Sequence, residues 1–284
     1  MSTIFPRERV TVVGVLNATP DSFSDGGRLV DDGGAVDVDA AVAVAAQMIE
    51  AGAQMIDVGG ESTRPGAMET PLAIEIDRTA PVVEALAKRF AVEISIDTRK
   101  SGVAEAALEA GARIVNDVSG LGFDAALAGI TAAAGASLIV GHLRGTPETM
   151  QRNPHFEDVL GEVATEIGVS LATARAAGIP DERLAVDPGI GFGKRLEDNL
   201  ALLANAGRLG EALGLPVLVG PSRKQFLGSL TGDPVECRDV ATAAACAVAI
   251  FAGADAVRVH DVAGAVRAAA VASALRDARR EAIA

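Results

Sequence analysis

The architecture of this chain can be inferred from one short segment, Glu93-Ile-Ser-Ile-Asp-Thr-Arg99. Its first half has the β-branched, alternating character of a strand, and its second half is polar. The Ala-rich stretch Ala73–Phe90 precedes it, and another ends at Glu109-Ala-Gly111, where the glycine is placed to stop a helix. A strand between two helices indicates one βα unit of a parallel sheet.

Eight apolar runs of this kind alternate with Ala-rich or amphipathic stretches such as Val38–Ala51, Phe156–Ala177 and Val240–Ala252. Eight βα units in 284 residues are typical of one (β/α)8 TIM barrel of α/β class, usually about 250 residues long. We therefore expect a single domain over residues 1–284, with a doubly wound open sheet as the alternative. The expected strands are Val10–Leu16, Met55–Val58, Glu93–Asp97, Ile114–Asn116, Ser137–His142, Leu184–Asp187, Pro216–Val219 and Ala256–His260.

Polar residues follow nearly every expected strand. An ordinary surface is also polar after a strand, but repetition at eight ends favours a site, because barrel enzymes carry their chemistry at the carboxyl ends of the strands. We expect these side chains to converge on one cavity. They include Asn17, Arg64, Asp97, Asn116, His142 with Arg144, Asp187, Lys224 and Arg258.

The loops after the first two strands are long and rich in hydroxyl groups and glycine. They span residues 17–27 and 59–66, and the first contains an aromatic residue, Phe23. Loops of this composition can close over a substrate as mobile lids and exclude water. Two ordinary surface turns are the alternative, although an aromatic residue in a polar lid favours a ligand beneath it.

Five basic residues at strand ends form a candidate anion clamp: Arg64, Arg223, Lys224, Arg258 and His260. Arginine suits bidentate phosphate contacts, and lysine supplies a point charge. Pairing with neighbouring acids is the alternative in so acidic a chain. Arg258-Val-His260 favours the clamp, because alternation places both side chains on one face of a strand.

Asp97, Asn116 and Asp187 are candidates for recognising a fused heteroaromatic ring through its donors and acceptors. Phe192, in the Gly-rich stretch Gly189–Lys194, is placed to pack on a planar ligand. That stretch lacks the spacing of a nucleotide-binding loop. Asp97 has an alternative reading as a core carboxylate paired with Lys224 or Arg258.

Composition narrows the class of protein. The net charge of −13 argues against a nucleic-acid binder with a broad basic face. Two cysteines, Cys237 and Cys246, are too few for a disulfide framework, and the amino terminus lacks an apolar secretory region. The longest apolar stretch is shorter than the roughly 20 residues that span a bilayer. We expect a cytoplasmic enzyme without a membrane partner; His142 with His260 is only a weak metal-site candidate.

Several motifs together resemble those of dihydropteroate synthases over almost the whole chain. The two most specific are Gly14-Val-Leu-Asn-Ala-Thr-Pro-Asp-Ser-Phe-Ser-Asp-Gly-Gly27 and Asp57-Val-Gly-Gly-Glu-Ser-Thr-Arg-Pro-Gly66. Others agree in order and spacing: Ser95–Arg99, Ile114–Val118, Asp187–Lys194, Ser222-Arg-Lys224 and Arg258–Val262.

The resemblance implies a (β/α)8 enzyme that joins 4-aminobenzoate to 6-hydroxymethyl-7,8-dihydropterin diphosphate with release of pyrophosphate. It implies that Mg²⁺ assists departure of the diphosphate before the amine attacks, that sulfonamides inhibit, and that the enzyme is a homodimer. Asn17 would hold Mg²⁺, with Asp25 as a weaker ligand. Carried over by motif, Asp97, Asn116, Asp187 and Lys224 would hold the pterin with Phe192, Ser222 and Arg223 nearby, Arg258 and His260 the diphosphate, and Thr63 and Arg64 would belong to the second loop.

The chain departs from the family pattern at three positions. Gly141 replaces a common Met and would enlarge the wall of the pterin pocket, Gln225 replaces a common Ser beside the carboxylate site, and Ala18 replaces Val. A pterin-binding methyltransferase barrel and a non-catalytic paralogue are the alternative functions. We expect Asn17→Ala and Arg258→Ala to impair turnover with little loss of fold.

Overall fold

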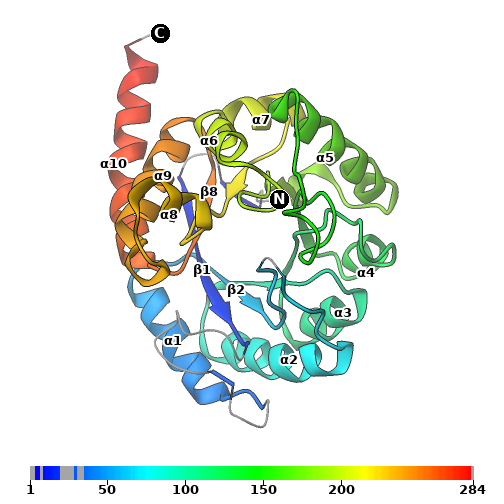
Figure 1. Cartoon of the computed structure of the whole chain (residues 1–284). Helices are drawn as coiled ribbons and strands as arrows, with labels where there is room; N and C mark the ends of the chain where they lie inside the picture. Colours follow the sequence, from blue (N-terminus) through cyan, green and yellow to red (C-terminus); the bar gives the residue numbers. More distant parts are fainter. Residues whose placement is uncertain (1–3, 7–8, 20–28, 31–34, 65, 283–284) are drawn as a thin grey trace.

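The structure is a computed structural model that describes residues 4–6, 9–19, 29–30, 35–64 and 66–282. Its eight strands run parallel in one sheet with the order β6-β5-β4-β3-β2-β1-β8-β7. Figure 1 shows them as the inner ring of the molecule. Their bounds are β1 Thr11–Asn17, β2 Met55–Gly59, β3 Glu93–Asp97, β4 Ile114–Asp117, β5 Ser137–Val140, β6 Leu184–Val186, β7 Leu218–Val219 and β8 Ala256–Val259.

The two edge strands of this sheet approach each other and close the ring. A parallel bridge joins Val186 to Val217, and the backbone N–H of Val186 donates to the carbonyl of Pro216 at 3.0 Å. The expected barrel is therefore confirmed, and the open-sheet alternative is wrong. Six strands have bounds within one residue of those expected. The expected β5 ran too far, because the strand ends at Val140 and His142 lies beyond it.

Helices surround the ring, as Figure 1 shows for most of them. No helix in the described ranges is both long enough and apolar enough to cross a membrane. The helices are α1 Val38–Glu50, α2 Leu72–Arg89, α3 Ser101–Ala110, α4 Leu127–Ala133, α5 Val159–Ala176, α6 Leu196–Ala204, α7 Ala206–Leu213, α8 Gln225–Thr231, α9 Asp239–Phe251 and α10 Val262–Glu281. Short 3-10 helices lie at Asp181–Arg183 and Val235–Cys237.

Local sequence signals set the helix ends. The side chain of Asp37 accepts a hydrogen bond from the backbone N–H of Ala40 at 2.9 Å and so caps α1, as an acidic N-cap residue should. Gly111 terminates α3 with a φ of 119°, a left-handed conformation that costs little without a Cβ. The expected stop at this glycine is confirmed.

The strands alternate between two environments. Residues such as Ile56 and Val58 face outward into the large core beneath the helices, while Met55 faces into the barrel. At the amino-terminal end the inward residues form one apolar layer, and the fully buried Phe5 is packed into it. The layer consists of Val13, Met55, Ile114, Ile139, Ala185, Leu218 and Ala256 together with Phe5.

Candidate active site

A polar layer lies directly above the apolar layer, two residues further along the same strands. Asp57 on β2 is completely buried and accepts three hydrogen bonds. The donors are the hydroxyl of Ser95 at 2.6 Å, Nδ2 of Asn116 at 2.9 Å and Nε of Arg258 at 2.5 Å. Asp57 therefore fixes the position of two residues that the sequence analysis assigned to the site.

Arg258 on β8 is shared between two carboxylates. Its Nη2 donates to Oδ2 of Asp97 at 2.7 Å, while its Nε contacts Asp57. Burial, together with the charge of Asp57, raises the pKa of Asp97 to about 7 despite the opposing effect of Arg258. Near neutral pH this carboxyl group can therefore either donate or accept a hydrogen bond. Asp97 is therefore paired with Arg258, as the alternative reading expected. It also lines the cavity.

Two further charged residues, Asp187 and Lys224, lie near this group and influence each other's pKa values through their charges. Asp187 follows β6 and accepts a hydrogen bond from the backbone N–H of Gly189 at 2.7 Å, and burial raises its pKa. The ammonium group of Lys224 lies 3.6 Å from the centroid of the Phe192 ring, a cation–π contact. Burial, reinforced by the charge of Arg258, lowers the pKa of Lys224 to about 8. Phe192 thus presents an aromatic face at the wall of the site, as expected.

These groups lie around one cavity of about 650 Å³ at the carboxyl ends of the strands. Asn116 and Asp187 do not line the cavity: Asn116 reaches it through Asp57 and Arg258, and Asp187 lies in the charged cluster with Lys224 and Arg258. The lining contains ten of the residues that were expected in the site, namely Asn17, Thr63, Arg64, Asp97, Phe192, Ser222, Arg223, Lys224, Arg258 and His260.

His260 lies at the mouth of the cavity between two polar partners. Its Nδ1 is 2.8 Å from the hydroxyl of Ser222, and its Nε2 is 3.4 Å from Nδ2 of Asn17. Burial, together with the charges of Arg223, Arg258 and Arg64, lowers the pKa of His260 to about 3. The imidazole is therefore neutral at pH 7 and carries one N–H. Donation of that N–H to an anion requires the contact with Asn17 to rearrange, because Nδ2 of Asn17 is itself a donor.

Arg223 lines the cavity, but its guanidinium group is paired with an acid. Nε and Nη2 donate to the two carboxylate oxygens of Asp239 at 2.7 and 2.9 Å. The backbone of Arg223 has a φ of 55°, and its N–H donates to the hydroxyl of Thr242 at 3.0 Å. Arg223 therefore pairs with a neighbouring acid, as the alternative reading expected. It contributes to the expected anion clamp through its long-range charge.

The two loops are described to different extents. Thr63 and Arg64 line the cavity, and the charge of Arg64 lowers the pKa values of Lys224 and His260, so the tip of the second loop faces that end of the site. Asp25 and Phe23 lie outside the described residues. Their expected roles stay predictions, as does the mobility of the loops.

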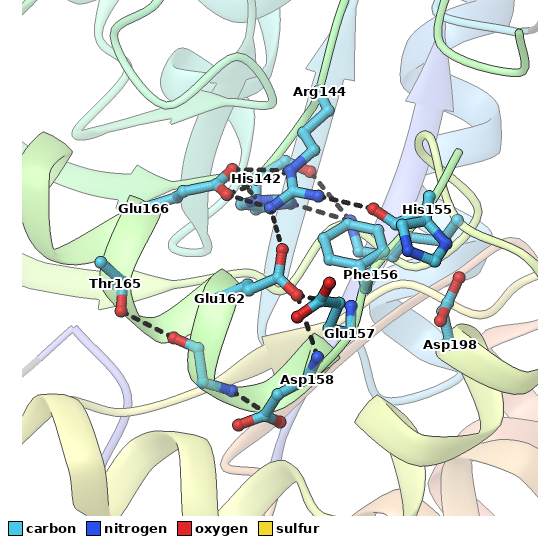
Figure 2. A network of polar contacts seen from close by, with 12 residues as sticks. His142, Arg144, His155, Phe156, Glu157, Asp158, Glu162, Thr165, Glu166 and Asp198 are labelled. Atoms are coloured by element: carbon cyan, nitrogen blue, oxygen red, sulfur yellow. Dashed lines mark hydrogen bonds and ion pairs between the residues drawn. The ribbon is translucent and has the colours of Figure 1, made fainter. Parts of the chain in front are cut away.

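His142 and Arg144 are turned away from the cavity toward α5. Figure 2 shows Arg144 beside Phe156 and the acidic side chains of Glu162 and Glu166. Nε2 of His142 lies 3.0 Å from Oε2 of Glu166, and its Nδ1 lies 2.9 Å from Nζ of Lys194. Burial lowers the pKa of His142 to about 4. His142 and His260 therefore belong to separate networks and do not form a pair.

The three departures from the family pattern have different surroundings. A Cβ on Gly141 would lie 2.6 Å from the carbonyl oxygen of Asp117 and the Cα of Val118, so this position faces backbone and the expected enlargement of the pocket wall is wrong. Gln225 lines the cavity at the start of α8. Ala18 is completely buried and donates its N–H to Gly59, where a small residue fits.

Three residues of the site were not anticipated from the sequence: Asp57, Gln151 and Lys194. The available signal for Asp57 was a carboxylate inside the otherwise apolar run Met55–Gly59, because a buried charge needs a partner. Gln151 and Lys194 lie in loops, where an ordinary solvated surface residue has the same sequence signature.

The sequence profile of the family described as "Pterin binding enzyme" matches residues 13–260. The dihydropteroate synthase of Synechocystis sp. is 43% identical over 248 residues, which cover 87% of this chain and 83% of that protein. A crystal structure of Yersinia pestis dihydropteroate synthase in complex with a sulfonamide drug matches with a TM-score of 0.90 and 39% identity, covering 98% of this chain and 99% of that chain.

A further match is the Xanthomonas albilineans dihydropteroate synthase solved with 4-aminobenzoic acid. Its TM-score is 0.85 at 42% identity, with coverage of 95% of this chain and 94% of that chain. The present chain therefore belongs to the family of pterin binding enzymes. The relatives named above are dihydropteroate synthases that match this chain over most of their length, and it is an enzyme of this type, a transferase of folate biosynthesis. The expected family is confirmed.

Proposed function

We propose that this enzyme condenses 6-hydroxymethyl-7,8-dihydropterin diphosphate with 4-aminobenzoate to give 7,8-dihydropteroate and pyrophosphate. The observation that carries the proposal is the convergence of Asp97, Lys224, Arg258 and His260 on one cavity. A carboxyl group, two cations and a neutral imidazole match a substrate with a heteroaromatic ring at one end and a diphosphate at the other.

The pterin ring binds over the polar layer. Asp97 can donate or accept a hydrogen bond at the ring edge because its pKa is about 7. Asn116 and Asp187 provide further amide and carboxylate groups behind it, and Phe192 packs on the ring face with Lys224 alongside. Because Asp57 holds both Asn116 and Arg258, these contacts are in place before the substrate arrives.

Departure of the diphosphate is the first chemical step. The bond between the exocyclic methylene carbon and the diphosphate oxygen breaks, the electron pair goes to that oxygen, and the ring delocalises the positive charge. Arg258 and His260 stabilise the developing anion, Arg258 by its charge and His260 by a hydrogen bond. The amine of 4-aminobenzoate then forms the new C–N bond and loses a proton.

Mg²⁺ fits one polar position at the mouth of the cavity. Asn17 ends β1 and lines the cavity, so its carboxamide oxygen can serve as a protein ligand. Mg²⁺ is commonly held by only one or two protein oxygens, with substrate phosphates and water completing the shell. Bound there, it would neutralise charge on the leaving diphosphate. Asp25 remains a weaker candidate ligand outside the described residues.

The decisive experiment measures pyrophosphate release by the purified protein. Release that requires the pterin diphosphate, 4-aminobenzoate and Mg²⁺ together is the expected result, and sulfonamides that mimic 4-aminobenzoate should inhibit it. A methyltransferase barrel or a non-catalytic paralogue would bind pterin without releasing pyrophosphate. Absence of release from folded, pterin-binding protein would contradict the proposal.

We also propose that the enzyme is a cytoplasmic homodimer formed through α9 and α10. Four large aliphatic side chains of these packed helices are exposed: Val240 by 84%, Val248 by 55%, Val271 by 62% and Leu275 by 58%. An exposed apolar patch of this kind is typical of an interaction surface. Val248→Asp with Val271→Asp should shift the mass in light scattering from dimer to monomer; an unchanged mass would exclude this surface.

A further inference from the structure

A cluster of contacts, here called the clasp, joins Glu61 near the start of the connection between β2 and α2 to Thr70 near its end. Oε1 of Glu61 accepts a hydrogen bond from the backbone N–H of Thr70 at 2.8 Å. Nζ of Lys100 bridges the same two positions, because it donates to Oε1 of Glu61 at 2.9 Å and to the carbonyl of Thr70 at 2.6 Å. The intervening segment, which includes Thr63 and Arg64, is therefore held at both ends by a single cluster.

The clasp is part of a buried quartet of charges. Nε and Nη2 of Arg99 both donate to Oε2 of Glu61, at 3.1 and 2.9 Å, and Lys100 also donates to Glu75 at 2.6 Å. The four side chains are between 0% and 7% exposed. Two acids and two bases balance, so none of these buried charges lacks a partner.

The two acids of the quartet respond differently to their surroundings. Although burial opposes it, hydrogen bonding by Lys100 and the charges of Arg99 and Lys100 hold the pKa of Glu61 below its usual value. Burial raises the pKa of Glu75, with a contribution from the charge of Glu61. Buried ion networks often add little net stability, and fixing one geometry is their best-supported use.

The geometry fixed here is that of the loop tip relative to the site. Arg64 follows Glu61 by three residues, lines the cavity, and its charge reaches Lys224 and His260. Asp97 lies in a separate group of contacts, with Asp57 on β2 and Arg258 on β8. Displacing the tip should therefore disturb the end of the cavity at Lys224 and His260 and leave the polar layer unchanged.

We propose that Glu61 is a positioning residue that sets the contribution of Arg64 to turnover of the pterin diphosphate, at the end of the cavity near His260. The inference rests on the proposed synthase reaction. Glu61 acts through the clasp, and the polar layer that receives the pterin ring does not depend on it.

The test is a double-mutant cycle with Glu61→Gln, Arg64→Ala and the combined variant. The assay is pyrophosphate release at varied concentration of the pterin diphosphate, with melting temperatures recorded in parallel. We expect each single variant to lower kcat/KM for the pterin diphosphate roughly 10- to 100-fold, since small misplacements at an active site have effects of this size. The combined variant should be no more impaired than the more impaired of the two single variants, because both changes remove the same interaction.

Binding of a pterin without the diphosphate gives an independent readout. The dissociation constant of 6-hydroxymethyl-7,8-dihydropterin should stay within about twofold of the wild-type value in Glu61→Gln, because the hydrogen bonds that hold the polar layer together do not involve Glu61. Glu84→Gln is the matched control: Glu84 lies on α2 with a half-exposed side chain that pairs with Lys88, and kinetics should not change. Multiplicative effects in the combined variant, or weaker binding of the pterin probe in Glu61→Gln, would overturn the proposal.

A second variant keeps the proposal testable if Glu61→Gln does not fold. Glu61→Gln with Arg99→Met removes one charge of each sign and leaves the Lys100–Glu75 pair intact. It should fold and show the same kinetic defect; unfolding of both variants would assign Glu61 a purely structural role and overturn the proposal. A wild-type protein that releases no pyrophosphate would contradict the synthase reaction itself, which is a different outcome from an additive cycle.

Discussion

The two ends of this barrel are built from the same strands but have opposite chemistry. On β2, Met55 belongs to the apolar layer and Asp57 to the polar layer, and on β8 the same step leads from Ala256 to Arg258. The step from one inward position to the next therefore changes an apolar packing environment into a charged one. The apolar layer is closed by Phe5, whereas the polar layer opens into the cavity.

The comparison explains how one barrel combines stability with a reactive site. Apolar side chains fill space without requiring partners, so the amino-terminal layer can tolerate residues as different as Met55 and Ala256 as long as the volume is filled. Buried charges require specific partners at hydrogen-bond distance, so the carboxyl-terminal layer depends on the identity of each residue.

The largest effect is expected for Arg258→Ala. This change leaves Asp57 and Asp97 without their shared cation, so the free energy of unfolding should fall by about 3–5 kcal/mol. Turnover should fall roughly 10²- to 10³-fold because the departing diphosphate loses a charged donor. The structure thus corrects the expectation of little loss of fold, since Arg258 lies inside the charged layer and not at its rim.

Urea denaturation and pyrophosphate release measure these two effects. Arg258→Lys is the control, because it keeps the positive charge but lacks the planar guanidinium group that donates to both acids. Relative to Arg258→Ala, its stability should recover more than its turnover. Wild-type stability of Arg258→Ala would mean that the two carboxylates do not need this cation.

At the opposite end, Phe5→Ala should lower the free energy of unfolding by about 3–5 kcal/mol, because it opens a cavity in the apolar layer. Turnover and pterin affinity of the folded protein should stay at wild-type levels, since Phe5 packs into the apolar layer at the amino-terminal ends of the strands and the cavity lies at their carboxyl ends. Chemical denaturation with calorimetric binding tests both statements. A loss of pterin affinity in folded Phe5→Ala would show that the two layers are coupled.

Asn17→Ala should affect chemistry with little change in stability. Among the described residues, the side chain of Asn17 makes a single long hydrogen-bond contact, 3.4 Å to His260, so the free energy of unfolding should change by less than about 0.5 kcal/mol. Turnover should fall roughly 10- to 100-fold at limiting Mg²⁺ if its carboxamide oxygen is a metal ligand. Titration of activity with Mg²⁺ checks this, and an unchanged Mg²⁺ dependence would remove Asn17 from the metal site.

The smallest expected effect is on the pH dependence of the free energy of unfolding, through the buried side chain of Lys194. Burial lowers its pKa from 10.5 to about 7, and the groups facing it are His142, Asp187, Lys224, Arg144 and Glu166. Between these two pH values the unfolded chain retains a proton that the folded lysine has lost, so this group makes stability rise with pH. The contribution is at most about 1.4 kcal/mol per pH unit.

Unfolding free energies measured between about pH 7.5 and 8.5 should therefore increase less steeply in Lys194→Met than in the wild type. A residual increase is expected, because the lowered pKa of Lys224 acts in the same direction. Lys88→Met, at an exposed lysine, should keep the wild-type slope. Equal slopes in Lys194→Met and the wild type would show that Lys194 is not titrating in this range.

Much of the site could be predicted because strand periodicity and strand direction are local properties. Asp97, Arg258 and His260 follow apolar runs, and parallel strands bring their carboxyl ends to one rim. Asp57 was not anticipated, because a single carboxylate inside the run Met55–Gly59 does not reveal its partners on β3, β4 and β8.

The sequence by itself determined the order of strands and helices, the helix stop at Gly111, and the alternation that places residues inside or outside the barrel, since each depends on neighbouring residues. The tertiary structure decided which charges pair. Arg223 turns to Asp239, His142 turns to Glu166, and Arg258 bridges two acids that lie 161 and 201 residues away. Pairing depends on distances between separate elements, and those distances exist only once the barrel has closed.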